Sequence, residues 1–168
     1  MRWLSFYRLS PDASSGPTYT QASFGYVVQT QDGAEGVVDV GMRSEYATLR
    51  DAIAAQALER LVAQCGDQAD VALDGLHFAP TITDPKKILC VGLNYKAHQE
   101  ETGRGGEGVP TVFVRFAAAQ MGHGEPMVRP RESASLDFEG EIAMIIGRGG
   151  RRIARKDAME HVVGFGIY

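Results

Sequence analysis

The sequence has few of the features that mark secreted, membrane or nucleic-acid-binding proteins. Its two cysteines, Cys65 and Cys90, are too few for a disulfide framework. No apolar stretch approaches the ~20 residues of a transmembrane helix, and the N-terminus lacks the apolar core and cleavage site of a signal peptide. The formal net charge of −4 favours neither nucleic acid nor an anionic membrane. We therefore expect a cytoplasmic protein without nucleic-acid or membrane partners.

The composition is that of a folded chain with one ordinary domain or two small ones. Hydrophobic residues make up 44% of the 168 residues and charged residues 23%, a balance typical of folded rather than disordered proteins. Basic side chains gather in one short run, which we interpret as a solvated turn and helix start rather than a phosphate-binding surface. The run contains Arg148, Arg151, Arg152, Arg155 and Lys156.

Residues 1–80 are predicted to form a small mixed α/β module. Two β-rich segments, 24–30 and 36–40, flank the turn signal Asp32-Gly33 and predict a β-hairpin. Apolar residues then recur at helical spacing over residues 49–64, where Thr48 can cap the start and Gly66 can end the helix. No catalytic residue types gather here, so we expect a packing or lid module.

A second domain is expected over residues 85–168, after a linker that contains prolines. The apolar run 88–93 is typical of a buried strand, further strands are predicted at 111–116 and 138–147, and a short amphipathic helix at 155–163. The sequence closes on apolar and β-branched residues, apparently within a strand. Because domains usually finish in a polar exposed tail, we expect a truncation, a split chain or a continuation beyond Tyr168.

The strongest chemical signal is the pair of glutamates Glu139 and Glu141. In a strand over residues 137–147 they would share one face with Ala143 and Ile145, with Cα atoms only ~6.6 Å apart. Carboxylates that converge to ~5 Å repel by about 3 kcal/mol at an effective dielectric constant of 20. A bound divalent cation or a shared proton would relieve that repulsion. We favour a metal site over an exposed edge because the following residues are apolar on both faces.

A second signal is the pair His98 and Glu101, in the polar segment after the run 88–93. On a helix, residues at positions i and i+3 lie on one face. A carboxylate that accepts a hydrogen bond from imidazole fixes its tautomer and raises its basicity, which suits a base that activates water. By itself, this common spacing favours a solvated surface helix over a catalytic pair.

Taken in order, these motifs resemble the fumarylacetoacetate hydrolase (FAH) family. The resemblance covers essentially all of residues 85–168, and residues 1–80 resemble, more weakly, the variable N-terminal module of many members. It is carried by the run from Lys87 to Tyr95, His98 with Glu101, the strand from Pro110 to Arg115, Pro130, the Asp137-Phe138-Glu139-Gly140-Glu141 motif with residues 145–147, and the closing segment 158–165.

The resemblance implies an α+β, β-rich fold: an FAH-type catalytic domain with a rolled mixed β-sheet, incomplete here, usually as a homodimer. It implies that Glu139 and Glu141 bind Mg²⁺, Mn²⁺ or Ca²⁺ and that His98 and Glu101 activate water. It further implies that substrate is held by Asn94, Tyr95 and Arg115. The implied activity is metal-dependent hydrolysis of a C–C bond in small 2-oxo or 2,4-dioxo acids such as acylpyruvates or fumarylacetoacetate.

Two departures from the family pattern leave alternatives open. Arg115 stands where the family commonly has lysine, which keeps the charge but replaces a point donor with a planar fork. The family's third metal ligand, an aspartate, would follow Tyr168. The alternatives are an oxo-acid decarboxylase, tautomerase or other lyase of the same family, and an inactive fragment or assembly module that needs a partner chain.

Overall fold

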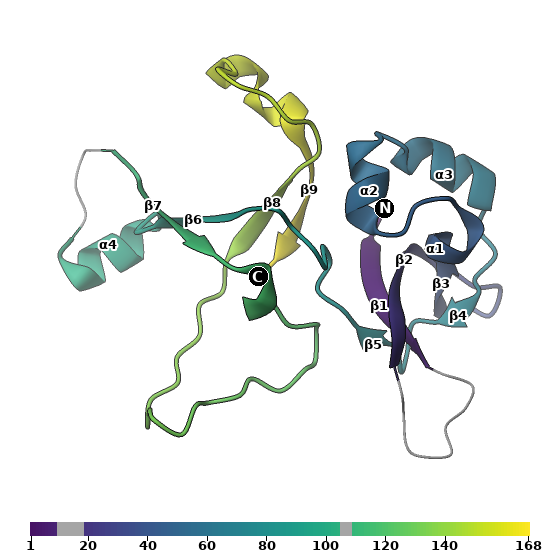
Figure 1. Ribbon diagram of the computed structural model, residues 1–168, viewed down its shortest axis with the longest axis horizontal. Helices are drawn as coiled ribbons and strands as arrows, with labels where there is room; N and C mark the ends of the chain where they lie inside the picture. The colour runs from purple at the N-terminus through teal and green to yellow at the C-terminus, as the bar shows by residue number, and fades with distance from the viewer. Residues whose placement is uncertain (10–18, 105–108) are drawn as a thin grey trace.

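The computed structural model describes residues 1–9, 19–104 and 109–168. The N-terminal module is compact, whereas the C-terminal part extends away from it as two hairpins joined by long loops (Figure 1). This strand-rich α+β architecture was predicted from the sequence and is confirmed. No helix within the described ranges is long and apolar enough to cross a bilayer.

The N-terminal module is built on a five-stranded antiparallel sheet. Its strand order is β4-β3-β2-β1-β5. The predicted hairpin is confirmed, because β2 pairs with β3 around a turn in which Gly33 has φ of 84°. The strands are β1 (Trp3–Leu9), β2 (Tyr19–Gln29), β3 (Glu35–Asp39), β4 (Val71–Ala72) and β5 (His77–Phe78).

Three helices cover one face of this sheet: α1 (Val40–Arg43), α2 (Leu49–Ala54) and α3 (Leu58–Cys65). The single helix predicted over residues 49–64 is wrong, because the chain breaks between α2 and α3 at Gln56, which has φ of 52°. The predicted ends are confirmed. Thr48 accepts a hydrogen bond from the backbone N–H of Asp51, and Gly66 follows the last turn of α3.

The C-terminal part contains two antiparallel hairpins instead of one continuous sheet. β6 (Ile88–Gly92) pairs with β7 (Thr111–Arg115), and β8 (Ile142–Ile146) pairs with β9 (Val162–Ile167). Helix α4 (Lys96–Thr102) lies between β6 and β7, η1 (Ala117–Ala119) follows β7, and η2 (Arg155–His161) precedes β9. The amphipathic helix predicted at 155–163 is therefore a 3₁₀-helix that ends at His161.

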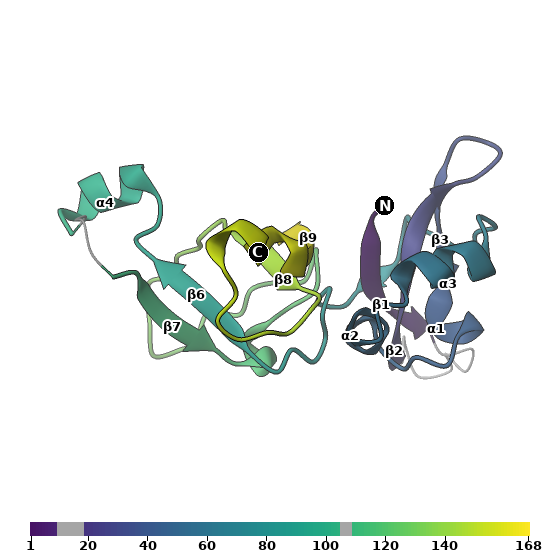
Figure 2. The ribbon, with the colours of Figure 1, turned by 90° about the horizontal axis from the view of Figure 1, so that it is seen from above.

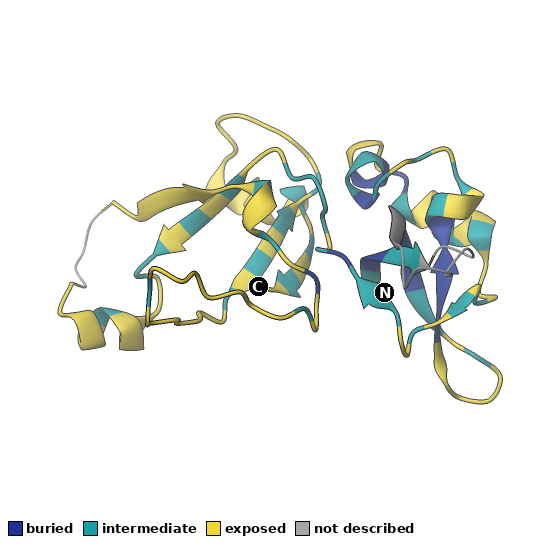
Figure 3. Cartoon of the chain, turned by 60° about the horizontal axis from the view of Figure 1, so that its bottom comes forward, coloured by how far each residue is buried: buried dark blue, intermediate teal, exposed yellow. Residues whose placement is uncertain are grey.

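The strands of these hairpins are more exposed than the sequence predicts. Leu89 and Val91 on β6 are 61% and 47% exposed, and Ile142 and Ile146 on β8 are 64% and 60% exposed. Figure 3 shows the buried residues gathered in the N-terminal module, while β6, β8 and β9 alternate between intermediate and exposed residues and β7 is exposed throughout. The expectation that residues 88–93 and 142–146 form buried strands is thus wrong, since none of the residues that the structure describes covers one face of each strand.

The two parts touch along a short stretch. Gln120 donates a side-chain hydrogen bond to the carbonyl of Ile82 at 3.2 Å, and a Cβ atom at Gly122 would lie 1.8 Å from the carbonyl oxygen of Phe78. Ile145 of β8 packs against the hydrophobic core of the module. The stretch between Phe78 and Ile88 is fully described and contains no helix or strand. The proposed domain boundary, between residues 80 and 85, lies within this stretch.

Candidate functional site

The two glutamates of the proposed metal site differ in their backbone setting. Glu141 exchanges two backbone hydrogen bonds of 2.8 Å with Tyr168, which extends the β8–β9 ladder by one pair. Glu139 precedes that ladder and is exposed, whereas Glu141 is partly buried. The expectation of one strand over residues 137–147 is therefore wrong, because strand hydrogen bonding begins at Glu141; the shared role of the two glutamates stays a prediction.

The face of the β8–β9 hairpin that carries Glu141 is open and lined by small residues. Directly opposed residues of an antiparallel pair project to the same side, so Tyr168 lies beside Glu141. Ala143 is opposite Gly166, where an added Cβ atom would meet no other atom within 4 Å. Glu141 and Tyr168 thus border a floor of small residues, and Ile145, further along the same face, packs against the core of the N-terminal module.

Arg115 reaches this face from the other hairpin. Its guanidinium carbon lies 5.7 Å from the centre of the Tyr168 ring, within the ~6 Å range of a cation–π contact. Because Tyr168 pairs with Glu141, Arg115 contacts the residue that lies opposite one proposed metal ligand. Among the residues that the structure describes, none forms a hydrogen bond or an ion pair with the guanidinium of Arg115. The N–H groups of the guanidinium are therefore available to a ligand.

His98 and Glu101 lie on α4 as the spacing predicts. The His98 Nδ1 and Glu101 Oε2 atoms are 3.6 Å apart, and the two side chains are 48% and 79% exposed. That distance is too long for a strong hydrogen bond, so the pair is loosely associated. Asn94 and Tyr95 precede the helix and are exposed. The chain turns there at Leu93, whose carbonyl accepts a 2.5 Å hydrogen bond from the side chain of Gln99.

The described chain does not bring the His98–Glu101 pair to the two glutamates. Gly92 pairs with Thr111 at one end of the β6–β7 hairpin, and Ile88 pairs with Arg115 at the other. Four residues of strand separate these ends by about 13 Å. Figures 1 and 2 both place α4 beyond the far end of the hairpin, away from β8 and β9.

The donor chemistry of the glutamate pair fits a hard divalent cation. Neither carboxylate forms a salt bridge or side-chain hydrogen bond with other described residues, so their oxygen atoms are available. Mg²⁺ commonly binds one or two protein carboxylates and keeps several waters or substrate oxygens. No cluster of three or more His, Cys, Asp or Glu side chains suited to a metal occurs in the described ranges.

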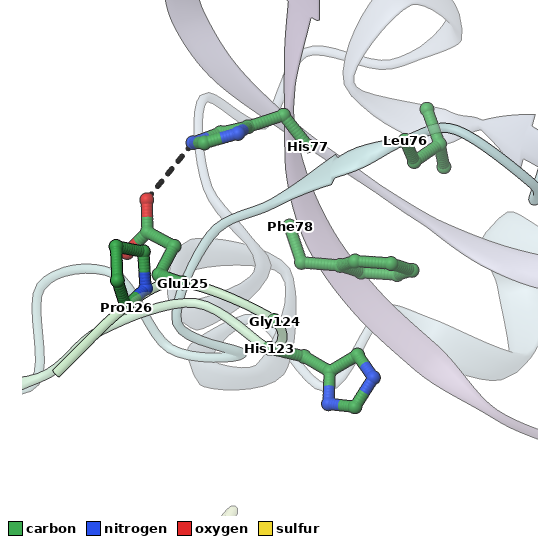
Figure 4. A pocket seen from close by; sticks show the side chains of 7 residues that line it. All are labelled: Leu76, His77, Phe78, His123, Gly124, Glu125 and Pro126. Atoms are coloured by element: carbon green, nitrogen blue, oxygen red, sulfur yellow. Dashed lines mark ion pairs between the residues drawn. The ribbon is translucent and has the colours of Figure 1, made fainter.

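A second cluster, which the sequence did not predict, lies between the module and the loop after β7 (Figure 4). His77 Nε2 and Glu125 Oε1 are 2.9 Å apart, and the ring of His123 packs edge-on to Phe78. These residues line a shallow pocket of about 430 Å³. Sequence spacing held no signal for the pair, because His77 and Glu125 meet only through the packing of the loop on β5. None of the predicted site residues lines this pocket.

Comparison with known proteins identifies the family. The family model described as fumarylacetoacetate (FAA) hydrolase C-terminal matches residues 87–168. The mitochondrial oxaloacetate tautomerase fahd2 of Xenopus laevis is 41% identical over 86 residues, which cover 51% of this chain and 27% of that protein. Human mitochondrial oxaloacetate tautomerase FAHD2A is 38% identical over 90 residues, which cover 54% and 29%.

A solved structure extends the likeness to the N-terminal module. The fumarylacetoacetate hydrolase of Exiguobacterium antarcticum superposes with a TM-score of 0.63 at 26% identity, over 98% of this chain and 54% of that chain. Residues 87–168 therefore belong to the fumarylacetoacetate hydrolase family, and the chain has its fold. The matched part of the chain spans only 27% and 29% of the length of these two curated relatives.

Proposed function

We propose that this chain takes part in the enolisation of a small 2-oxo acid of the oxaloacetate type, bound with a divalent cation. The observation that supports the proposal is the contact that places the free guanidinium of Arg115 beside the Glu141–Tyr168 pair. A guanidinium fork matches a carboxylate, and a carboxylate next to the keto group is what distinguishes 2-oxo acids. The relatives at about 40% identity carry the name oxaloacetate tautomerase.

The proposed cation ligands are Glu139 and Glu141, with Mg²⁺, Mn²⁺ or Ca²⁺ as candidates because all three favour carboxylate oxygens. A divalent cation supplies Lewis-acid stabilisation of negative charge on the enolate oxygen. Arg115 binds the substrate carboxylate, and the small residues around Gly166 leave room for the carbon skeleton. Glu141 lies next to Tyr168, so its carboxylate and the guanidinium can act on the same end of one small acid.

Hydrolysis of a C–C bond in an acylpyruvate- or fumarylacetoacetate-like acid is the second candidate. It is favoured by the similarity to the Exiguobacterium fumarylacetoacetate hydrolase. Hydrolysis needs an activated water in addition to enolisation, and His98 with Glu101 is the proposed base. Since that pair follows Gly92, at the end of the β6–β7 hairpin opposite to Arg115, the geometry of this chain favours the reaction that needs no activated water. Decarboxylation stays a further alternative.

The proposal is tested with Mn²⁺ binding and oxaloacetate turnover by the unaltered chain and by Glu141→Gln. Changing even an outer partner of a metal ligand costs 10- to 100-fold in affinity, so we expect Mn²⁺ affinity to fall about 100-fold. Glu132→Gln, an exposed glutamate outside the motif, is the matched control. Enol decay, followed by ultraviolet absorbance, is expected to slow in parallel.

Product analysis separates the candidates. Keto–enol interconversion without new fragments supports the tautomerase, whereas two acid or keto fragments from an acylpyruvate support the hydrolase. Metal affinity that is unchanged in Glu141→Gln contradicts the ligand assignment. An unaltered chain without either reaction favours the assembly-module alternative. A cytoplasmic location and a homodimer stay predictions; the relatives are named as mitochondrial proteins.

A further inference from the structure

The residue that follows β9, Tyr168, has a side chain that no motif singled out. Tyr168 carries the ring against which Arg115 lies, at 5.7 Å from the guanidinium carbon to the ring centre. Arg115 belongs to the β6–β7 hairpin and Tyr168 to the β8–β9 hairpin. Their contact therefore crosses between two sheets that share no strand.

The contact with the Tyr168 ring bears on the orientation of the Arg115 side chain. All five residues of β7 are exposed, so packing does not restrict the rotamers of its long side chain. An aromatic face attracts the cation without using its N–H groups, which are directional donors to carboxylates. The ring can thus orient Arg115 and leave its donor edge for a ligand.

The position of Tyr168 determines where the N–H groups of the Arg115 guanidinium lie. Its backbone N–H and carbonyl each form a 2.8 Å hydrogen bond with Glu141, so the ring stands next to the Glu141 carboxylate on the same face. A side chain at the next position on that face, Gly166, would meet no other atom within 4 Å. The open floor allows a small planar acid to contact both charged groups.

We propose that Tyr168 is a positioning residue that holds the Arg115 guanidinium beside Glu141 and so selects ligands with a planar carboxylate. This inference rests on the proposed function for the identity of the ligand, but not for the contact itself. It also gives a role to the arginine at position 115. A planar guanidinium can stack on a ring and still present a fork, whereas an ammonium group is a point donor with neither property.

The contact is tested first, without reference to activity. In the full 168-residue chain, the Nε–Hε proton of Arg115 is expected to show an upfield ring-current shift in a ¹H–¹⁵N spectrum. The shift should persist in Tyr168→Phe, which keeps the ring, and vanish in Tyr168→Leu. The Arg115→Lys variant assigns the signal. A shift that persists in Tyr168→Leu would overturn the positioning role.

The ligand is tested next, with oxalate as the probe in the presence of Mg²⁺, by isothermal titration. Tyr168→Leu is expected to weaken oxalate binding about threefold, the size of an exposed cation–π contact, and Tyr168→Phe to bind like the unaltered chain. In an Arg115→Lys background, Tyr168→Leu should have a smaller effect. Equal weakening in both backgrounds would show that Tyr168 acts on structure alone and would overturn the proposal.

The two readouts separate the possible failures. A ring-current shift without any oxalate binding would contradict the proposed function, and with it the selection of carboxylates, while the contact between Tyr168 and Arg115 stands. Oxalate binding without the shift would leave the proposed function intact and overturn the role of Tyr168.

Discussion

At the scale of single residues, backbone conformation is strained at positions where the chain changes direction. Gln56 between α2 and α3 and Leu93 between β6 and α4 have φ of 52° and 54°, in the left-handed region that disfavours side chains other than glycine. At Gln56 the turn has a clear purpose. It lets Ala57 and Leu61 join Ile53 in one hydrophobic cluster, which a continuous straight helix would place differently.

We predict that Gln56→Gly stabilises the protein. Removing the side chain relieves left-handed strain of about 1–2 kcal/mol, and the greater entropy of glycine in the unfolded chain offsets part of the gain. The expected increase in the free energy of unfolding is about 0.5–1 kcal/mol, measured by urea denaturation monitored by the fluorescence of Trp3. The matched control is Gln64→Gly, within helix α3, which should lose about 1 kcal/mol. A loss of stability in Gln56→Gly would contradict the assignment of strain.

Of the contacts between single residues at the candidate site, the sequence predicts only the local one. His98 and Glu101 are three residues apart, and helical geometry alone brings them together, as expected. The contact of Arg115 with Tyr168 joins residues 53 positions apart and depends on how two hairpins pack. Patterns in one sequence report local periodicity and cannot specify such a contact.

At the scale of elements, one buried carboxylate ties together the strands and the first helix of the module. Asp39 is 1% exposed and receives hydrogen bonds of 2.7 Å and 2.8 Å from the guanidinium of Arg8 on β1. It also accepts a hydrogen bond from Ser23 on β2, at 2.5 Å, and from the backbone N–H of Met42 in α1, at 3.1 Å. These bonds fix the start of α1 against the sheet.

We predict that Asp39→Asn destabilises the module by about 3 kcal/mol. The amide keeps the shape, but it removes the negative charge that balances Arg8 and replaces one acceptor with a donor, and breaking a buried ion pair costs about 3–5 kcal/mol. Thermal or urea unfolding measures the loss. Glu35→Gln is the control, because Glu35 pairs with Arg2 at the surface with 42% exposure, where such pairs contribute about 0–1 kcal/mol. Similar losses in both variants would contradict a special role for Asp39.

Element boundaries show where sequence patterns succeed and where they fail. The β2–β3 hairpin follows from its turn residues, and both ends of the α2–α3 region follow from capping residues. The break at Gln56 lies in a run of alanines without glycine or proline, so no local signal marks it. Similarly, apolar residues on both faces of β8 predict burial, but burial depends on a second layer, and the described part of the chain places none over the face of Ile142 and Ile146.

At the scale of the whole molecule, hydrophobic burial is concentrated at one end. Among the described residues, every buried hydrophobic side chain lies between Leu4 and Ala79. Each of the two hairpins of the C-terminal part exposes large apolar side chains on one face, among them Leu89 and Val114 on the first and Ile142 and Ile146 on the second. Isolated two-stranded sheets have marginal stability, and contiguous exposed apolar patches mark interaction surfaces. We therefore expect the module to be stable by itself and the hairpins to need a covering surface.

We therefore predict that the 168-residue chain associates as its concentration rises, and that residues 1–85 alone stay monomeric and folded. Covering the outer face of β8 removes apolar area from water at roughly 25 cal/mol per Å², so association is the expected response to this exposure. Sedimentation velocity over a hundredfold concentration range measures both species. Replacing Ile142 and Ile146 with threonine, which suits strands, should weaken association and leave the unfolding of the module unchanged. If that double variant associates as strongly as the unaltered chain, β8 is not the surface involved; if residues 1–85 do not fold, the N-terminal module depends on the hairpins after all.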